Sequence, residues 1–359
     1  MQIGNYIKIV LFSLFLTVTA SAQHGEVSHD THSAEPKGIR ERINEVKEHH
    51  LADSHDFILY STDAGKHVGF SLPVILWDNG LKVFSSSKFH YGETIAEVSG
   101  SHYKMVHNKI YKADAHGNVA EEHGHPVKEA KVLDFSITRN VVFILFAGLI
   151  MFFMFRSLAK SYSKNNSIPT GIGRFLEPIV LYVRDDIAIA NIGEKHYRKY
   201  MPFLLTVFFF IWILNLLGLT PLGANVTGNI AVTASLALLT YLMTTFTAKK
   251  DYWKHIFWMP GVPTPMKIIL APIELLGTII KPFSLLIRLY ANMTAGHVVL
   301  MSIIGLMFIF KNWIGSPLSF GLAFGLSLLE LLVAALQAYI FTMLSALYFG
   351  SASEEHSDH

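Results

Sequence analysis

The stretch Arg288-Leu-Tyr-Ala-Asn292-Met-Thr-Ala-Gly-His297 lies within an apolar segment that runs from residue 268 to residue 310. A guanidinium group stays protonated at every pH that a protein meets, so Arg288 keeps its charge there. Placing an arginine at the centre of a membrane helix costs roughly 2.5–3.5 kcal/mol, and such residues face a partner or water. The stretch therefore predicts a membrane helix that carries a functional site.

The last two apolar segments are longer than a membrane crossing requires. As single helices, residues 268–310 would extend about 64 Å and residues 318–349 about 48 Å, whereas the hydrocarbon core is about 30 Å thick. We therefore expect two long helices that are tilted or bent. Pro272 and Pro282 are positions at which the first could bend.

The composition excludes several classes of protein. The 359 residues are 51% hydrophobic with a mean hydropathy of +0.38, which is not that of an ordinary soluble domain. The formal net charge of +2 is too small to indicate a nucleic-acid partner. The chain has no cysteine, which rules out disulfides and cysteine-based metal or nucleophile chemistry.

Three further apolar segments complete a coherent membrane topology, at residues 135–155, 203–219 and 230–246. The loops that follow the first and third of them are basic, whereas the loop 220–229 contains no lysine or arginine. Basic loops remain in the cytoplasm, so we expect five crossings with the N-terminus outside and the C-terminus inside. Within the first basic loop, an amphipathic helix over 175–187 is expected to lie along the interface, because its apolar residues share one face: Phe175, Leu176, Ile179, Val180, Val183 and Ile187.

The region before the membrane half divides into two parts. Residues 1–22 read as a signal peptide, with Lys8 before a short apolar core and Ala20-Ser21-Ala22 as the cleavage site. Residues 23–132 predict a small, histidine-rich, β-rich domain outside the cytoplasm, and residues 133–359 form the membrane domain. Asn79-Gly80 predicts a hairpin between strands over 68–76 and 81–85, and a second strand pair could flank residues 115–118.

Helical geometry groups the polar residues of the long segments. Glu274, Lys281 and Arg288 are seven residues apart and stay within about 40° of one another, with Asn292 on the same stripe. His297 falls about 180° from Arg288. On the last helix, Glu330 and Gln337 share a face. One interpretation is an internal ion pair between Arg288 and Glu330; the other is a proton relay, because intramembrane carboxylate and imidazole groups commonly form one.

The membrane half resembles subunit a of the F-type ATP synthase membrane sector. The motifs that carry the resemblance match in order and spacing: Asn215-Leu-Leu-Gly218, Glu274, Lys281-Pro282, Arg288-Leu-Tyr-Ala-Asn292-Met-Thr-Ala-Gly, and Leu336-Gln337-Ala338-Tyr339-Ile340-Phe341. Many bacterial relatives carry an acid at the position of His297 and a histidine at that of Glu330. This exchange preserves the pair and favours proximity of the two side chains.

The resemblance implies a role for each of these residues. Arg288 would face the carboxylate of a rotating c-subunit ring, with Asn292 as polar support. The outer access path would use His297, Glu330 and Gln337. Glu274 would belong to the inner path, Lys281 could line that path or reach the interface, and Asn215 could serve the outer path or bond between helices.

The resemblance also implies a setting. The partners would be the ring, other ATP synthase subunits including the peripheral stalk b, and the lipid of a bacterial inner membrane. The translocated ion would be a proton, and no cofactor, bound metal or nucleic acid is expected. The chain has no P-loop motif, so nucleotide chemistry must lie on other subunits.

Two other functions remain open at this point. A secondary transporter would also carry buried charges, although it should show an internal repeat, and none is convincing here. A membrane-anchored metal-binding protein is suggested by the histidines of the N-terminal domain, although an anchor needs only one crossing: His49, His50, His55, His102, His107, His123 and His125.

Overall fold

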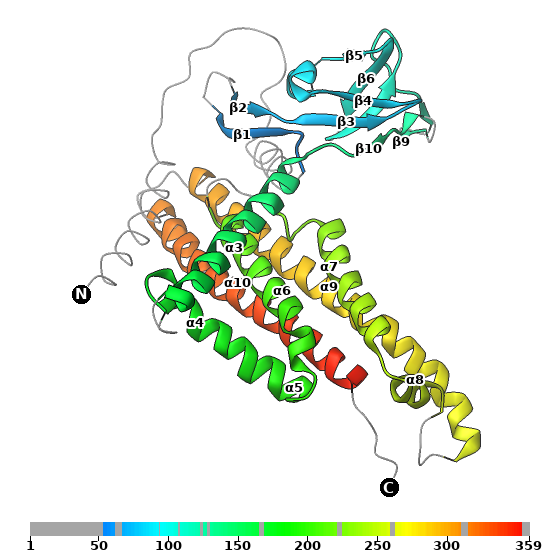
Figure 1. The fold of residues 1–359 in the computed structure, drawn as a ribbon. Helices are drawn as coiled ribbons and strands as arrows, with labels where there is room; N and C mark the ends of the chain where they lie inside the picture. Colours follow the sequence, from blue (N-terminus) through cyan, green and yellow to red (C-terminus); the bar gives the residue numbers. More distant parts are fainter. Residues whose placement is uncertain are drawn as a thin grey trace.

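The computed structural model describes residues 53–61, 67–92, 94–106, 108–122, 125–127, 130–164, 169–220, 225–258, 263–309 and 315–353. A β domain, residues 53–138, stands at one end of a bundle of helices (Figure 1). The expected signal peptide and the segment that follows it, up to residue 52, lie outside the described residues.

Among the described residues, five helices are long and apolar enough to cross a membrane, and each predicted crossing falls on one of them. They are α3 (Arg139–Lys164), α6 (Tyr197–Gly218), α7 (Ile230–Thr247), α9 (Thr264–Ile309) and α10 (Gly315–Ser353). Helix α3 begins later than predicted because residues 135 and 137 still form sheet-like hydrogen bonds with the strand at residues 73–77. The Phe135 N–H donates to the Ile75 carbonyl at 2.8 Å, and the Ile137 N–H donates to the Pro73 carbonyl at 3.1 Å.

The two longest helices are continuous, as predicted. α9 has 46 residues and α10 has 39, which correspond to about 69 Å and 58 Å of helix, well above the roughly 30 Å of a hydrocarbon core. Pro272 and Pro282 lie inside α9 without ending it. A short helix, α8 (Lys250–Phe257), packs against α9 beyond the end of α7.

The last helix packs against several others, and its C-terminal half is held most tightly. α10 contacts both α6 and α9, and α7 contacts α9. Phe341 and Phe349 of α10 are fully buried, and the Tyr200 ring stacks on Phe349 with centroids 4.6 Å apart. A Cβ at Gly350 would overlap the Asn191 carbonyl oxygen, so only glycine permits this close approach of the two backbones.

The amphipathic segment forms a continuous helical run in three parts. These are α4 (Ile172–Tyr182), the π-helical turn η3 (Val183–Ile189) and α5 (Ala190–Ile192). Leu176, Val183 and Ile187 of the predicted apolar face are buried, whereas Phe175 is 65% exposed. Phe175 lies at the edge of the predicted face, about 100° from Leu176.

The β domain contains four small antiparallel sheets. Strands β10 (Leu133–Asp134), β3 (Pro73–Trp77) and β4 (Leu81–Ser85) form one, and β5 (Ala96–Val98), β6 (Ser101–Val106) and β7 (Lys109–Ala113) form another. The remaining pairs are β1 (Asp56–Ser61) with β2 (His67–Ser71), and β8 (Glu121–Glu122) with β9 (His125–Pro126). The core between the three-stranded sheets includes Leu76, Phe89 and Tyr103.

The predicted hairpin is confirmed, whereas the strand before it was predicted wrongly. Asn79 and Gly80 have φ values of 51° and 134° between β3 and β4. The predicted strand 68–76 is divided at Leu72 into β2 and β3, which belong to different sheets. Leu72 is buried and its amide and carbonyl bond to Ser86, whose 3₁₀ segment η1 (Ser86–Gly92) follows β4. Around residues 115–118 the flanking pair is a single bridge, between Ala113 and Val119.

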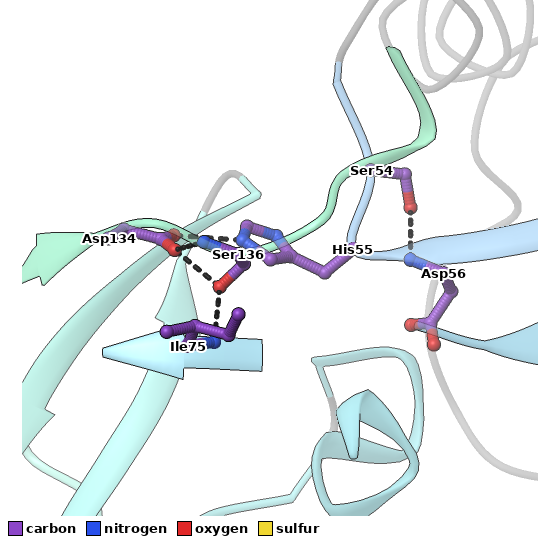
Figure 2. Close-up of polar contacts among 6 residues, drawn as sticks. All are labelled: Ser54, His55, Asp56, Ile75, Asp134 and Ser136. Carbon is purple, nitrogen blue, oxygen red and sulfur yellow. Dashed lines mark hydrogen bonds and ion pairs between the residues drawn. The ribbon is translucent and has the colours of Figure 1, made fainter. Parts of the chain in front are cut away.

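A partly buried polar cluster lies where the β domain meets the first membrane helix (Figure 2). His55 Nε2 lies 2.8 Å from Asp134 Oδ2, and Asp134 Oδ1 accepts hydrogen bonds from the amide and hydroxyl of Ser136. The Ser136 hydroxyl oxygen in turn accepts from the Ile75 N–H at 3.0 Å. The cluster therefore ties the segment before β1 to β10 and β3, directly before α3 begins.

The same segment before β1 also holds the first turn of α3. Asp53 Oδ1 accepts the N–H of Asn140 at 3.1 Å, and the Ser54 carbonyl accepts the N–H of Arg139 at 2.8 Å. These bonds satisfy amides that a helix start leaves without an intrahelical partner. The Phe57 and Phe143 rings stack with centroids 5.5 Å apart and add an apolar contact.

Hydrogen bonding at this junction depends on the charge of Asp134. Burial raises the pKa of Asp134, but the hydrogen bonds from His55 and Ser136 together outweigh burial and hold the pKa below its ordinary value of 3.8. A depressed carboxyl pKa contributes stability that is present above the unfolded pKa and lost as the pH falls through the folded pKa. The contribution of Asp134 to the junction is therefore present at neutral pH and weakens below about pH 4.

We predict that Asp134→Asn loosens this junction at pH 7. Hydrogen bonds to a charged group contribute about 1.5–3 kcal/mol, so amide exchange over residues 133–138 should become roughly tenfold faster or more. Hydrogen–deuterium exchange of the full chain measures this. Asp114→Asn is the matched control, because that carboxylate bonds only within its own loop, to the amides of His116 and Asn118. Equal exchange in Asp134→Asn and the wild type would contradict the assignment.

Candidate functional site

The polar residues predicted on α9 lie where that helix meets α10 and α8. Three contacts fix α9 and α10 in an antiparallel register. Lys281 Nζ lies 5.5 Å from the Tyr348 ring centroid, Asn292 bonds to Gln337, and the Glu330 carboxyl group lies over Gly296. The site therefore extends along the shared length of the two helices instead of occupying one point.

Asn292 and Gln337 form a direct hydrogen bond between the helices. Asn292 Nδ2 donates to Gln337 Oε1 at 2.8 Å, and Gln337 is only 1% exposed. The family resemblance predicted both residues in the site but assigned Gln337 to the outer path and Asn292 to the surroundings of Arg288. The structure brings them together in one contact.

Arg288 is half-buried and makes no hydrogen bond or ion pair with any residue that the structure describes. The register places it beside Phe341, whereas Glu330 is eleven residues further along α10, about 16 Å away. The interpretation of an internal ion pair between Arg288 and Glu330 is therefore wrong. The reason is the helix register, which the spacing within each helix does not determine.

His297 and Glu330 reach the same contact between helices without bonding to each other. A Cβ built on Gly296 would lie 2.7 Å from Glu330 Oε1, so the carboxyl group packs on the backbone directly beside His297. His297 is 6% exposed. Its Nε2 atom, Glu330 Oε2 and Thr294 Oγ1 are buried without hydrogen-bond partners among the described residues. Buried polar atoms without partners are unusual in a folded protein.

Asn215 connects α6 to α10 and to the loop before α7. Its side chain is fully buried; Nδ2 donates to the Ala334 carbonyl at 3.4 Å, and Oδ1 accepts from the Thr227 hydroxyl at 2.8 Å. Asn225 Oδ1, in the same loop, is buried and has no partner among the described residues. Asn215 thus bonds between helices, as one of its two interpretations predicts.

Lys281 lies in a small cavity at the other end of the site. The cavity lies between α7, α8, α9 and α10, and most of the residues that line it carry a hydroxyl group: Thr240, Tyr241, Thr244, Tyr252, Thr278 and Tyr348. Glu274 is close to the same cavity. Burial raises the pKa of the Tyr252 phenol, and the neighbouring Tyr241 and Glu274 raise it further.

Sequence reasoning missed several of these residues. Asn225 and Thr227 lie in the one uncharged loop of the membrane half, and that signal could have identified them. Thr294 is three residues before His297 and shares its side of the helix, which is a weaker signal. Tyr252 and Tyr348 gave no signal, because an aromatic residue is most often part of the hydrophobic packing.

Much of the surface of α9 and of the N-terminal half of α10 is left uncovered by the other described residues. Only 11% of the most apolar stretch of α9 and 17% of that of α10 are buried, against 50% for α6. Ala291 and Ala295, close to Arg288 on α9, are exposed and small. The surface around Arg288 is therefore open to lipid or to another helix.

The histidines of the β domain form no metal site that the structure describes. Among the described residues no group of three potential ligands comes together. His55 instead bonds to Asp134, and His102 lies on β6. His49, His50, His107 and His123 lie outside the described residues, as does the side chain of His125.

Each half of the chain matches a known protein family. A family model described as ATP synthase A chain matches residues 141–350, and a model described as a domain of unknown function matches residues 46–135. The chain is 44% identical to ATP synthase subunit a of Chloroherpeton thalassium over 65% of its length and 72% of the relative. It is 41% identical to ATP synthase subunit a 2 of Chlorobaculum tepidum, over 71% of its own length and 73% of the relative. It is 40% identical to ATP synthase subunit a of Pelodictyon phaeoclathratiforme, over 75% of its own length and 80% of the relative.

We predict that a short bifunctional thiol reagent links the helices in the double variant Asn292→Cys with Gln337→Cys. The wild-type side chains meet at 2.8 Å, and the chain has no other cysteine, so the product would be unambiguous. The control pair, Asn292→Cys with Glu330→Cys, separates the thiols by a further seven residues, about 10 Å along α10. Equal linking of both pairs on denaturing gels would contradict the register.

Proposed function

Because the chain belongs to the ATP synthase A chain family, we propose that it is the stator against which a ring of c subunits turns, with Arg288 facing the ring carboxylate. Members of the family are non-catalytic membrane subunits of the rotary complex, and the chain is a proton-translocating subunit of the Fo sector that associates with other Fo subunits. In the proposal, its polar residues divide into a fixed charge, an outer path and an inner path.

The observation that carries the proposal is Arg288 without a counter-charge. Its guanidinium keeps its charge in a membrane helix, and no described carboxylate of the chain neutralises it. A charge in this setting needs a partner or water. The uncovered surface and the small Ala291 and Ala295 leave room for a carboxylate on a neighbouring helix.

Electrostatics describe what Arg288 would do to that carboxylate. Opposite unit charges about 4 Å apart attract by about 4 kcal/mol at an effective dielectric constant of 20. Arg288 would thus favour the ionised carboxylate as it passes and make the ring subunit release its proton on one side and bind another on the opposite side. The same fixed charge would oppose direct passage of protons between the two sides.

The outer path would run through the buried polar groups without partners. Thr294, His297 and Glu330 can each exchange hydrogen bonds with water or a moving proton, because none of the buried atoms named above is committed to a partner among the described residues. Gln337 and Asn292 would continue this path toward Arg288. Asn215, with Thr227 and Asn225, would support it from α6 and the adjoining loop.

The inner path would use the cavity at Lys281. Its hydroxyl lining can hold water near Glu274 and Lys281 on the opposite side of Arg288 from His297. Lys281 lies in this cavity and so serves the path in preference to reaching the interface.

The proposed setting rests on the charge of the loops and on the family. The complex would lie in a bacterial inner membrane, with the β domain in the periplasm after removal of residues 1–22 and the C-terminus in the cytoplasm. The partners would include the c ring and the peripheral stalk b. A secondary transporter gains no support, because the relatives are subunits of ATP synthase.

We predict that Arg288→Ala abolishes ATP-driven proton uptake by inverted vesicles that contain the whole complex. Loss of the fixed charge removes the group that makes the ring carboxylate release its proton. Arg198→Ala is the control, because this exposed residue contacts its neighbour Tyr197 outside the site. Undiminished uptake with Arg288→Ala in an assembled complex would overturn the stator proposal.

We predict that exchanging both residues of the outer pair is less harmful than exchanging one. His297→Glu or Glu330→His alone places two groups of one kind at a buried contact and should lower proton uptake roughly tenfold or more. The double variant restores one imidazole and one carboxyl group and should recover part of the rate. If the double variant loses as much proton uptake as the two single variants combined, the residues do not act as a pair.

A further inference from the structure

The sheet formed by β10, β3 and β4 has two apolar faces. Its inner face, with Val74 and Leu76 fully buried, packs into the core of the β domain. Its outer face is exposed although its residues are large and apolar, with exposed fractions of 56% to 63%: Trp77, Leu81, Val83, Leu133 and Phe135. A strand with one exposed face usually alternates apolar and polar residues, and this sheet does not.

The exposed residues form one continuous patch. In the strand register, Trp77 stands between Leu133 of β10 and Leu81 of β4. Val83 stands opposite Ile75, whose carbonyl accepts the amide of Phe135. Neighbours across strands are in side-chain contact distance, so the five residues join into a single apolar surface, which we call the outer patch. Such a surface marks an interaction site.

The second three-stranded sheet is different. Its outer-facing residues alternate with buried ones and are mostly polar or charged: Glu97 of β5, His102 and Lys104 of β6, and Lys109 of β7. Of the two three-stranded sheets in the described part of the domain, the first therefore exposes large apolar residues and the second exposes mostly polar ones; Phe70 and Tyr91 are also exposed, outside these two sheets.

The outer patch adjoins the membrane helices. Arg139, where α3 begins, is the fifth residue after Asp134 of β10, so the two are at most about 18 Å apart. Within three turns of that start, α3 exposes Leu145, Phe146 and Leu149, as a helix surrounded by lipid does. In Figure 1, β10 is the strand of its sheet nearest the helices, and β5 and β6 are the strands farthest from them.

We propose that the outer patch rests in the lipid surface that α3 enters, at the boundary between headgroups and acyl chains. Phe135 extends the patch to the segment that leads into α3, and Trp77 is of the residue type enriched at that depth. The β domain is then attached to the bilayer by its sheet as well as by α3. This inference depends on membrane embedding and not on the stator mechanism.

Spin labels on single cysteines test the proposal, because the chain has no cysteine of its own. Leu81→Cys places a label in the outer patch, Val83→Cys provides a second position in it, and Lys109→Cys is the matched control on the exposed edge of the polar sheet. The full chain is reconstituted in vesicles of phosphatidylcholine and phosphatidylglycerol. Collision of each label with oxygen, which concentrates in lipid, is compared with collision with a water-soluble nickel chelate.

The ratio of oxygen to nickel collisions should be severalfold higher at positions 81 and 83 than at 109. An equal ratio at all three positions would place the patch in water and overturn the proposal. Shielding of positions 81 and 83 from both reagents would also overturn it, because the patch would then be covered by protein, either the N-terminal segment of this chain or another copy. Native mobility of the control label shows that the domain remains folded.

Discussion

The permanent charge of Arg288 is the constraint on which the rest of the membrane domain depends. A carboxylate or imidazole in an apolar segment can become neutral, but a guanidinium cannot. Its helix must therefore provide an opening for a counter-charge, and α9 does so by leaving most of its apolar length uncovered. Packing that would normally bury such a helix is instead confined to its contacts with α10, α7 and α8.

The C-terminal half of α10 is held rigidly in the bundle, although the surface of α9 around Arg288 is open. Phe341 and Phe349 are buried in the bundle, and Gly350 lies against the backbone at Asn191. Glu330, further toward the exposed half of the helix, keeps a buried carboxyl oxygen without a partner among the described residues. One end of α10 thus fixes the register with α9, and the polar groups beyond it retain unused hydrogen-bonding capacity.

The fold of the membrane half could be predicted from hydrophobic segments and loop charges, because the bilayer imposes both. Details set by contacts between distant segments could not. The start of α3 depends on sheet bonds from residues 135 and 137, and the break at Leu72 depends on Ser86. For the site, periodicity grouped the residues of each helix correctly. It could not decide that Gln337 meets Asn292 or that Glu330 lies far from Arg288, because that requires the register between two helices.

The distances along α9 have an electrical consequence. His297 is nine residues from Arg288 and Glu274 is fourteen, which correspond to about 14 Å and 21 Å of helix. On the proposed function, water reaches inward from both ends and shortens the insulating layer to the part around Arg288. The transmembrane voltage, worth about 2.3 kcal/mol per elementary charge for each 100 mV, would then fall across that short layer. The field acting on the ring carboxylate would be steeper than the field across the surrounding lipid.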